Sequence, residues 1–290
     1  MRVLVIGSTG PLGSDVVRAF SGGDVVGLDH KAIDIEIPSS ITDALNHYRP
    51  DFVVNAAAFH NVELCESRPD RAFAVNALAV DDLAAQCALA KIHLVHVSTD
   101  YVFDGRATTP YDESAPVGPL SVYAISKVAG EQLLQRHGGD WTIVRTSGLY
   151  GVRGSRTKGH TFIERILTQA AEGRPLHVVN DITFSPSYTR HVADGIRRII
   201  ESGAGGIFHV TNSGHCTWYE FAREIIRQSG VDAELHETTS ELFPTAARRP
   251  AFSALGHGAL ARAGLGTMPA WQEGIRDYLS ERSAAAPAFG

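Results

Sequence analysis

The chain has 290 residues, 44% of them hydrophobic, which suits one large α/β domain or two lobes. A net charge of −6 argues against a nucleic-acid or membrane-surface binder, no apolar run is long enough to span a membrane, and the amino terminus enters a strand without a signal peptide. Neither the 13 histidines nor Cys65, Cys87 and Cys216 show metal-ligand spacing, so we expect a cytoplasmic protein with reduced packing thiols and no metal.

Short apolar strands alternate with amphipathic helices through the first half of the chain. This alternation predicts a Rossmann-type α/β fold, a doubly wound parallel sheet with helices on both faces. We expect strands at 2–6, 24–28, 51–55, 92–98 and 141–146, and helices at 11–20, 39–48, 69–90 and 121–137.

The alternation breaks after Arg145. The Gly-rich residues 151–159 predict a mobile loop, and the small residues from Ser283 to Gly290 predict a disordered tail. Between them we expect helices at 160–172, 189–201, 217–229 and 269–281, with a strand at 206–210.

These patterns predict two parts. Residues 1–147 would form a dinucleotide-binding domain, to which the chain returns around 177–200 and 245–256. Residues 148–290 would mainly form a smaller substrate-binding lobe over the carboxyl edge of the sheet, where ligands bind in open α/β folds.

A glycine motif, Gly7-x-x-Gly10-x-x-Gly13, follows the first strand and opens the first helix. A dinucleotide-binding glycine motif must lie in this position, between a strand and a helix. Gly7 would allow a tight turn, Gly10 would let the backbone approach a pyrophosphate, and Gly13 would let the helix pack closely on the sheet. The helix N-terminus attracts phosphates, so we expect the cofactor to contact this turn through Gly7, Thr9, Gly10, Pro11, Leu12 and Gly13.

Asp29 ends the second strand, where an acid binds a ribose 2′-hydroxyl and disfavours a 2′-phosphate. His30 and Lys31 follow at once, and either suits a phosphate, so the choice between NAD and NADP stays open. Asp29 as a plain turn residue is the alternative. Asp34 and Ile35 lie where adenine is often contacted.

Small residues, Ala56, Ala57 and Ala58, follow Asn55 at the end of the third strand. Bulky side chains there would collide with a cofactor lying across the sheet edge. The residues therefore suit a cofactor site, although tight helix packing is an alternative explanation.

Tyr123 and Lys127 are four residues apart in a helix for which Ser121 is a candidate N-cap. Such residues share a helix face, and an adjacent ammonium lowers the pKa of a phenol from about 10. A surface i,i+4 pair is the alternative. We expect Tyr123 to act as a proton donor, with Thr99 hydrogen-bonding the substrate carbonyl oxygen and Ser98 as the rival for that role.

The sequence resembles the extended short-chain dehydrogenase/reductase family, in its dTDP-4-dehydrorhamnose reductase branch. The likeness covers nearly the full length: Gly7 to Gly13, Asn55 to Ala58, Ser98-Thr-Asp-Tyr-Val-Phe-Asp-Gly105, Tyr123-x-x-x-Lys127 with Glu131, Arg145 to Ser147, Asn180-Asp181, Ser185-Pro186, Thr217 to Tyr219, and Arg248-Arg-Pro250 with Ser253. The resemblance implies that Thr99, Tyr123 and Lys127 form the catalytic set, that Tyr123 and Lys127 also contact NADP or NAD, and that Lys127 binds the nicotinamide ribose.

The resemblance further implies a nucleotide-sugar substrate and a site that receives it. The expected substrate-binding residues are Glu63, Thr99, Asp100, Tyr101, Phe103, Tyr123, Gly148 and Arg249, with capping or pairing as the alternative for Asp100. Gly148 stands where the family usually has a sugar-packing Trp, and Glu63 and Leu64 replace an Asp and a Lys. Asp15 and Arg190 stand near the family's interface Mg²⁺ glutamates, so no metal of that kind is expected.

These features predict reduction by NAD(P)H of the 4-keto group of a nucleotide-linked 6-deoxy sugar. A reductase or epimerase for another nucleotide sugar is one alternative, favoured by Gly148. A non-catalytic NADP-binding subunit resembling the methionine adenosyltransferase β subunit is another. The family often forms dimers, so a homodimer is possible.

Overall fold

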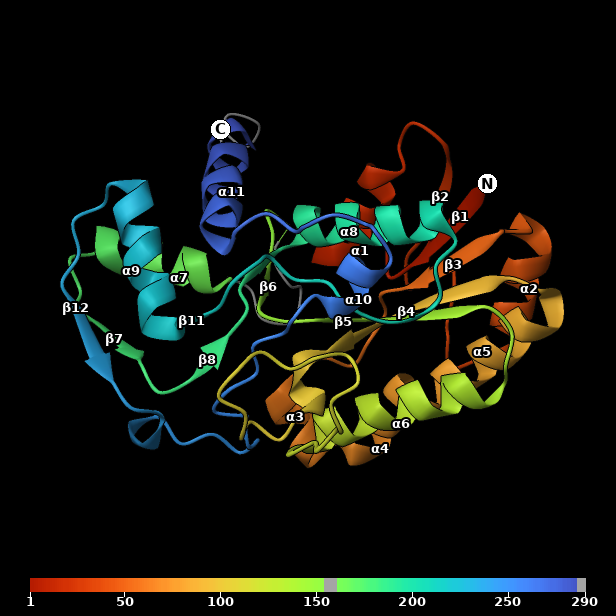
Figure 1. The fold of residues 1–290 in the computed structure, drawn as a ribbon, viewed down its shortest axis with the longest axis horizontal. Coiled ribbons are helices and arrows are strands. Elements are labelled where there is room, and N and C mark those ends of the chain that lie inside the picture. The colour runs from red at the N-terminus through yellow and green to blue at the C-terminus, as the bar shows by residue number, and fades with distance from the viewer. Residues whose placement is uncertain (154–160, 286–290) are drawn as a thin grey trace.

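The computed structural model describes residues 1–153 and 161–285. Its centre is a six-stranded parallel sheet, drawn on the right of Figure 1. The strand order is β10-β5-β4-β3-β1-β2, so the sheet is doubly wound as expected: from β1 it extends to β2 on one side and to β3, β4, β5 and β10 on the other. The strands are β1 (Arg2–Ile6), β2 (Asp24–Leu28), β3 (Phe52–Asn55), β4 (His93–Thr99), β5 (Trp141–Thr146) and β10 (Gly206–His209).

Alternate side chains of each strand enter two separate cores, because successive residues of a strand point to opposite faces. Leu4 and Ile6 of β1 join one hydrophobic cluster, and Val3 and Val5 join the other. The first face is covered by α2 (Pro38–Tyr48), α5 (Ala79–Ala90) and α6 (Val122–Arg136). The second face lies under α1 (Pro11–Ala19), α8 (Thr189–Ser202) and α10 (Gly258–Arg262), above the sheet in Figure 1.

A smaller lobe, on the left of Figure 1, has a third core between α7 (Phe162–Ala171), α9 (Trp218–Ser229) and α11 (Trp271–Ala285). Thr217 and Glu220 form a capping box that starts α9. Three two-stranded pairs complete this lobe and its junction: β6 (Leu149–Tyr150) with β9 (Ser187–Tyr188), β7 (Leu176–Val179) with β12 (Leu235–Thr238), and β8 (Thr183–Phe184) with β11 (Cys216–Thr217).

The expected helix at 69–90 is interrupted. It comprises α4 (Pro69–Phe73), a π-helical segment η1 (Ala74–Leu78) and α5, and a short helix α3 (Val62–Ser67) precedes it. Single-turn 3₁₀ helices lie at η2 (Asp100–Val102) and η3 (Ser240–Leu242). The periodicity of apolar residues predicts a continuous helix and does not reveal one added residue in a turn.

The carboxyl terminus also differs from expectation. α11 continues to Ala285, so the expectation of disorder from Ser283 onward is wrong for its first residues. The rest of that tail (286–290), most of the expected loop at 151–159, and the start of the helix expected at 160–172 lie outside the described residues. The division at residue 147 stays a prediction, although α8 and β10 join the larger layer from beyond it.

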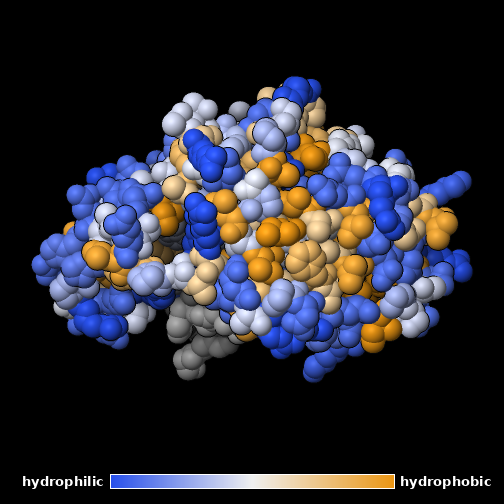
Figure 2. Space-filling model, turned by 90° about the horizontal axis from the view of Figure 1, so that it is seen from below, coloured by the Kyte–Doolittle hydropathy of each residue, from blue (hydrophilic) through white to orange (hydrophobic). Residues whose placement is uncertain are grey.

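One helical stretch within the described ranges, Pro69–Ala90, is long and apolar enough to cross a membrane. Its α5 part packs against the sheet through Val80 and Leu83, as the core helix of a soluble protein does. Seen from below, the larger lobe carries more hydrophobic surface than the smaller one (Figure 2), and Leu78 and Ile125 are among its exposed apolar residues. The three cysteines are free and buried, as packing thiols are.

Candidate active site

The candidate site lies at the carboxyl edge of the sheet, where β1, β3 and β4 end. The parallel register puts Ile6 beside Asn55 and Asn55 beside His96, so the segments that follow these strands start from neighbouring positions. The glycine turn, Ala56 to Ala58 and Thr99 therefore come from one edge, although they are far apart in the sequence.

The glycine turn has the backbone geometry expected of a dinucleotide cradle. Gly7 has a φ of +80°, and a Cβ there would lie 2.9 Å from the nitrogen of Ala57. A Cβ on Gly13 would lie 2.2 Å from the carbonyl oxygen of Gly7. Gly10 starts α1 without a side-chain cap, which leaves the helix N-terminus open to a phosphate. The geometry confirms the turn and close-packing roles of Gly7 and Gly13.

Asp29 lies in a turn at the end of β2. Its Oδ1 accepts hydrogen bonds from the backbone N–H groups of Lys31 (3.0 Å) and Ala32 (3.1 Å). The plain turn role is therefore present, and the second carboxylate oxygen has no hydrogen bond recorded among the described residues. His30 and Lys31 are exposed beside it.

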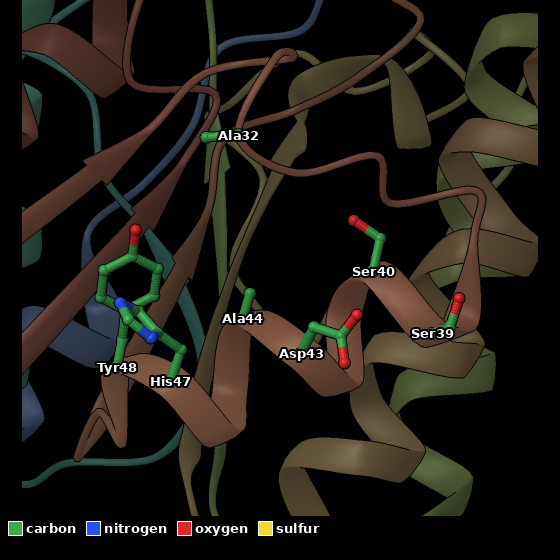
Figure 3. A pocket seen from close by; sticks show the side chains of 7 residues that line it. All are labelled: Ala32, Ser39, Ser40, Asp43, Ala44, His47 and Tyr48. Atoms are coloured by element: carbon green, nitrogen blue, oxygen red, sulfur yellow. The ribbon is translucent and has the colours of Figure 1, made fainter.

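An open hollow of about 470 Å³ lies between this turn and α2. Figure 3 shows side chains of α2 directed toward the loop that carries Ala32. The residues that line this hollow do not include Thr99, Tyr123 or Lys127, so the hollow is separate from the candidate active site. Its lining residues are Ala32, Ser39, Ser40, Asp43, Ala44, His47 and Tyr48.

The segments expected near adenine and beside a cofactor lying across the sheet edge are held by contacts with the backbone. Asp34 accepts from the N–H of Glu36 through Oδ1 (3.0 Å), whereas Ile35 is buried in the core. Ala56 donates its N–H to the carbonyl of Ile6 (3.0 Å), and Ala57 donates to Asn55 Oδ1 (3.1 Å). Ala56, Ala57 and Ala58 are half-buried, so this edge presents small side chains, as expected.

Tyr123 lies in the first turn of α6, which Ser121 caps by accepting the N–H of Ala124 (3.3 Å). Its ring meets that of Tyr101 edge-on at 6.2 Å. Burial raises the pKa of Tyr123 above its ordinary value, while a hydrogen bond with Thr99 acts in the opposite direction. The expected lowering of this pKa by Lys127 is therefore wrong for this arrangement.

Lys127 explains the difference, because its terminal nitrogen is directed into the protein. Nζ contacts the carbonyl oxygen of Val97 at 2.7 Å and Nε2 of His96 at 2.9 Å. The side chain is 1% exposed, and burial lowers its pKa to about 8, against the opposing effect of Glu131. Tyr123 and Lys127 share a helix face, as expected, but the structure records no hydrogen bond between them.

Two buried networks fix the ends of β4 and β5. Ser98 donates to Glu131 (2.5 Å), which also forms a two-pronged ion pair with Arg145 (2.7 and 3.0 Å). Ser98 is thus occupied away from the cleft, which disfavours it as the rival of Thr99.

The second network is centred on Asp100, which accepts from Ser253 (2.6 Å), Ser147 (2.8 Å) and Thr99 (3.1 Å). Burial raises the pKa of Asp100 to about 6, although these hydrogen bonds oppose the rise. The side chain therefore pairs inside the protein, which was the alternative given for it.

Two of the residues expected to bind the substrate, Glu63 and Arg249, contact each other. Arg249 donates to Glu63 at 2.6 Å, and the N–H of Ala247 donates to the other carboxylate oxygen at 3.1 Å. Burial raises the pKa of Tyr101 to about 12, and Arg249, which hydrogen-bonds it, opposes this rise. Glu63, Tyr101 and Arg249 thus form one polar cluster joining α3 to the segment before Pro250.

Gly148 has a φ of +51°, and a Cβ on it would lie 2.5 Å from the ring of Phe184. Phe184 stacks on Trp218 with ring centroids 3.9 Å apart. A ring from another strand therefore fills the space beside residue 148. The expectation that the side chain of Phe103 contacts substrate is wrong, because it is fully buried and stacks on Tyr111 at 4.1 Å.

Sequence reasoning missed His96, Asn76 and the pairing of Glu131 with Arg145. Asn76, in the π-helical η1, holds both backbone groups of Phe59 (2.8 and 3.0 Å) and Ser126 Oγ (3.0 Å). A buried polar residue in an apolar stretch is a signal that was available in the sequence.

Asp15 and Arg190, which stand near the family's interface Mg²⁺ glutamates, both have partners within the protein. Thr189 donates to Asp15 (2.5 Å), and Arg190 pairs with Glu281 (3.1 Å). Within residues 1–153 and 161–285, no group of three or more His, Cys, Asp or Glu residues is arranged to hold a metal ion.

Comparison with known proteins matches residues 1–284 to the family described as "RmlD substrate binding domain". The spore coat polysaccharide biosynthesis protein SpsK of Bacillus subtilis is 39% identical over 98% of this chain and 99% of its own length. A probable dTDP-4,6-dihydroxy-2-methyloxan-3-one 4-ketoreductase of Streptomyces antibioticus is 37% identical over 98% of this chain and 97% of its own. The crystal structure of dTDP-4-dehydrorhamnose reductase from Bacillus anthracis in complex with NADP is 32% identical, with a TM-score of 0.91 over 97% of this chain and 99% of that one.

Proposed function

Because the chain belongs to the RmlD substrate binding domain family, we propose that it is an NAD(P)H-dependent reductase of the 4-keto group of a nucleotide-linked 6-deoxy sugar. Our specific proposal is a dTDP-4-dehydrorhamnose reductase, the last enzyme of dTDP-L-rhamnose synthesis. The observation that carries the proposal is the meeting of Thr99 and Tyr123 at the edge where the glycine turn lies, in a chain similar over its whole length to such reductases.

The glycine turn fits the cofactor. Side chains at Gly7 and Gly13 would collide with the backbone, and the uncapped start of α1 at Gly10 offers N–H groups to a pyrophosphate. Both NADP and NAD are compatible with the exposed turn after β2, since only one Asp29 carboxylate oxygen is hydrogen-bonded among the described residues and Lys31 offers a cation. When bound, NAD(P)H supplies a hydride to C4 of the keto sugar.

Tyr123 supplies the matching proton. As C4 receives the hydride, the phenol Oη gives its proton to the carbonyl oxygen, so that C=O becomes CH–OH, and Tyr123 is then reprotonated from solvent. The Thr99 hydroxyl, which donates its one proton to Asp100 in the structure, turns to donate it to the same oxygen while negative charge builds there. Lys127 holds the nicotinamide ribose. Arg249 and Glu63, now paired with each other, are the groups we assign to the nucleotide diphosphate and a sugar hydroxyl.

The test is oxidation of NADH and NADPH, followed by absorbance, with dTDP-4-keto-L-rhamnose generated in place. We expect rapid oxidation by the wild-type protein. Tyr123→Phe should lose at least about 100-fold in kcat while it still binds cofactor, because general acid catalysis is worth roughly 10²–10⁴-fold. Unchanged activity in this variant would refute the role of Tyr123.

A second candidate is a reductase or epimerase for another nucleotide sugar. Gly148 favours it, because the aromatic residue usual at this position is replaced by a contact with Phe184. Absence of oxidation with the rhamnose precursor, followed by oxidation with another 4-keto sugar nucleotide, would favour it. Cofactor binding without turnover of any such sugar would instead favour the non-catalytic NADP-binding subunit.

We also propose a cytoplasmic location and a homodimer. Leu78 and Ile125 are 59% and 44% exposed on η1 and α6, two segments that pack together, and such residues suit burial in an interface. Light scattering coupled to gel filtration tests the dimer by its mass.

A further inference from the structure

Three buried side chains form a hydrogen-bond network that runs from the end of β3 through β4 to α6. Asn55, His96 and Lys127 are 0%, 0% and 1% exposed. Asn55 Nδ2 lies 3.3 Å from Nδ1 of His96, and Nε2 of the same ring lies 2.9 Å from Nζ of Lys127. Both ring nitrogens are therefore engaged, and water has no direct access to them.

A backbone contact fixes which groups donate and which accept in this network. Ala57 N–H donates to Asn55 Oδ1 at 3.1 Å, so the amide of Asn55 must face His96 with its NH₂ group. An NH₂ group can only donate, which makes Nδ1 of His96 an acceptor. A neutral imidazole with an unprotonated Nδ1 carries its proton on Nε2.

His96 is held neutral as well as oriented. Burial, reinforced by the positive charge of Lys127, keeps the pKa of His96 well below its usual value. The neutral ring carries one proton, and the contact with Asn55 determines which ring nitrogen carries it.

We propose that His96 is a positioning residue for Lys127 and that it presents an N–H donor, rather than a lone pair, to Nζ. An ammonium group has three donors and no lone pair, so it cannot accept this hydrogen bond. A neutral amine accepts it and still donates to the carbonyl of Val97, at 2.7 Å. The series of hydrogen bonds from the Ala57 N–H to Nζ thus favours the uncharged form of Lys127.

The other charged groups around Lys127 do not offset this preference fully. Glu131, one turn along α6, favours the ammonium but is itself paired with Arg145 of β5 and bonded to Ser98 of β4. Asp100, at the end of β4, is surrounded by three hydroxyl groups. The lowered pKa of Lys127 agrees with this balance.

The first test is the tautomer of His96, read from ¹⁵N–¹H correlations of the imidazole in the protein without added cofactor. The proposal requires a proton on Nε2 and none on Nδ1 above the Lys127 pKa of about 8, where Nζ is an uncharged amine. A proton on Nδ1, alone or together with one on Nε2, would overturn it. This measurement needs neither cofactor nor substrate, so its result does not depend on the proposed function.

The second test compares two variants that each keep one half of the ring's contacts. In His96→Gln the amide reaches the position of Nε2 and offers an oxygen to Nζ, so Lys127 can stay charged. In His96→Asn the amide reaches only the position of Nδ1, so Nζ loses its contact with residue 96 and keeps the one with the Val97 carbonyl. The readout is the pKa of Lys127, from the ¹³Cε shift of that lysine as a function of pH.

We expect His96→Gln to raise this pKa by on the order of one pH unit, because an acceptor replaces a donor. His93→Gln is the control, since His93 lies on the same strand but contacts Thr142 at 2.8 Å, and it should leave the Lys127 titration unchanged. An unchanged titration in a folded His96→Gln variant would contradict the proposal. If that variant does not fold, the tautomer of the wild-type ring still decides.

A third readout rests on the proposed function. If Lys127 binds the cofactor ribose as an ammonium, NADPH affinity measured by fluorescence should fall with rising pH, with a midpoint that His96→Gln moves upward. A midpoint that stays in place while the NMR titration moves would separate the roles: His96 would still position Lys127, and the ribose contact would be wrong.

Discussion

Lys127 is the residue at which the needs of folding and of chemistry conflict most directly. Its four-carbon stem and amine are almost fully buried, and burial disfavours the charge that the proposed reaction uses. The folded pKa of about 8 lies below the value of 10.5 for an unfolded chain. Between these two pH values the unfolded chain holds a proton that the folded chain has released, so the free energy of unfolding rises with pH across this window.

Replacing Lys127 by Met should therefore stabilise the protein at neutral pH while abolishing turnover. We expect roughly 1–3 kcal/mol of added stability at pH 7, because the burial of a charge is removed and the volume is kept. Urea unfolding measures this difference, which should shrink between pH 8 and pH 10.5 as the wild-type lysine loses its proton. A Lys127→Met protein that is less stable at pH 7 would show that its two hydrogen bonds outweigh the burial cost.

Gly148 allows a similar test of local packing. Gly148→Ala should lower the free energy of unfolding by roughly 1–3 kcal/mol, because a Cβ meets the Phe184 ring at 2.5 Å and φ is +51°. Gly173→Ala is the matched control, since its φ is +65° but nothing lies within 4 Å of the added carbon. Thermal unfolding of both variants separates backbone strain from the collision, and equal losses would argue against the contact with Phe184.

The sequence predicted residue types at the site better than their surroundings. Tyr123, Thr99 and the glycines were recognisable because their spacing is local and follows element boundaries. The direction of the Tyr123 pKa was missed, because spacing along a helix does not say how deeply a phenol is buried or where the neighbouring amine points. The same holds for Phe103, which lies in a motif but packs in the core.

At the scale of elements, the turn between β1 and α1 brings Gly13 of the helix against the Gly7 carbonyl group. Gly13→Ala should separate them, because the added carbon would lie 2.2 Å from the Gly7 carbonyl oxygen. We expect a loss of roughly 1–3 kcal/mol in stability and a fall of about tenfold or more in NADPH affinity, measured by fluorescence titration. Gly22→Ala, with nothing within 4 Å, should change neither, and a Gly13→Ala protein with wild-type affinity would contradict the cradle.

The long elements were predictable and the short ones were not. β1 to β5 and helices α1, α2, α6, α8 and α9 match the sequence expectations to within about two residues at each end, the usual uncertainty of boundaries. Pairs such as β6 with β9 contain two residues per strand, too few for any periodicity. They pair segments that are far apart in the sequence, which no local pattern records.

At the scale of the whole molecule, the contact between Arg249 and Glu63 joins two distant parts of the chain. We expect Arg249→Met to raise KM for the nucleotide sugar about 10- to 100-fold with a smaller change in kcat, because the diphosphate loses a two-pronged donor. Arg248→Met is the control, since that residue is exposed and forms no recorded ion pair among the described residues. Steady-state kinetics measures both, and equal effects of the two substitutions would indicate a general effect of charge.

The position of β10 in the sheet has a consequence for how the protein is made. β10 pairs with β5, but during translation β5 leaves the ribosome more than sixty residues before β10 does. The helix α8, which covers the second face of the sheet, also emerges late. Until then the growing polypeptide displays an open strand edge beside an uncovered apolar surface, a combination that promotes aggregation. Holdase chaperones should therefore bind nascent chains that stop after Thr146 and release those extended well past His209.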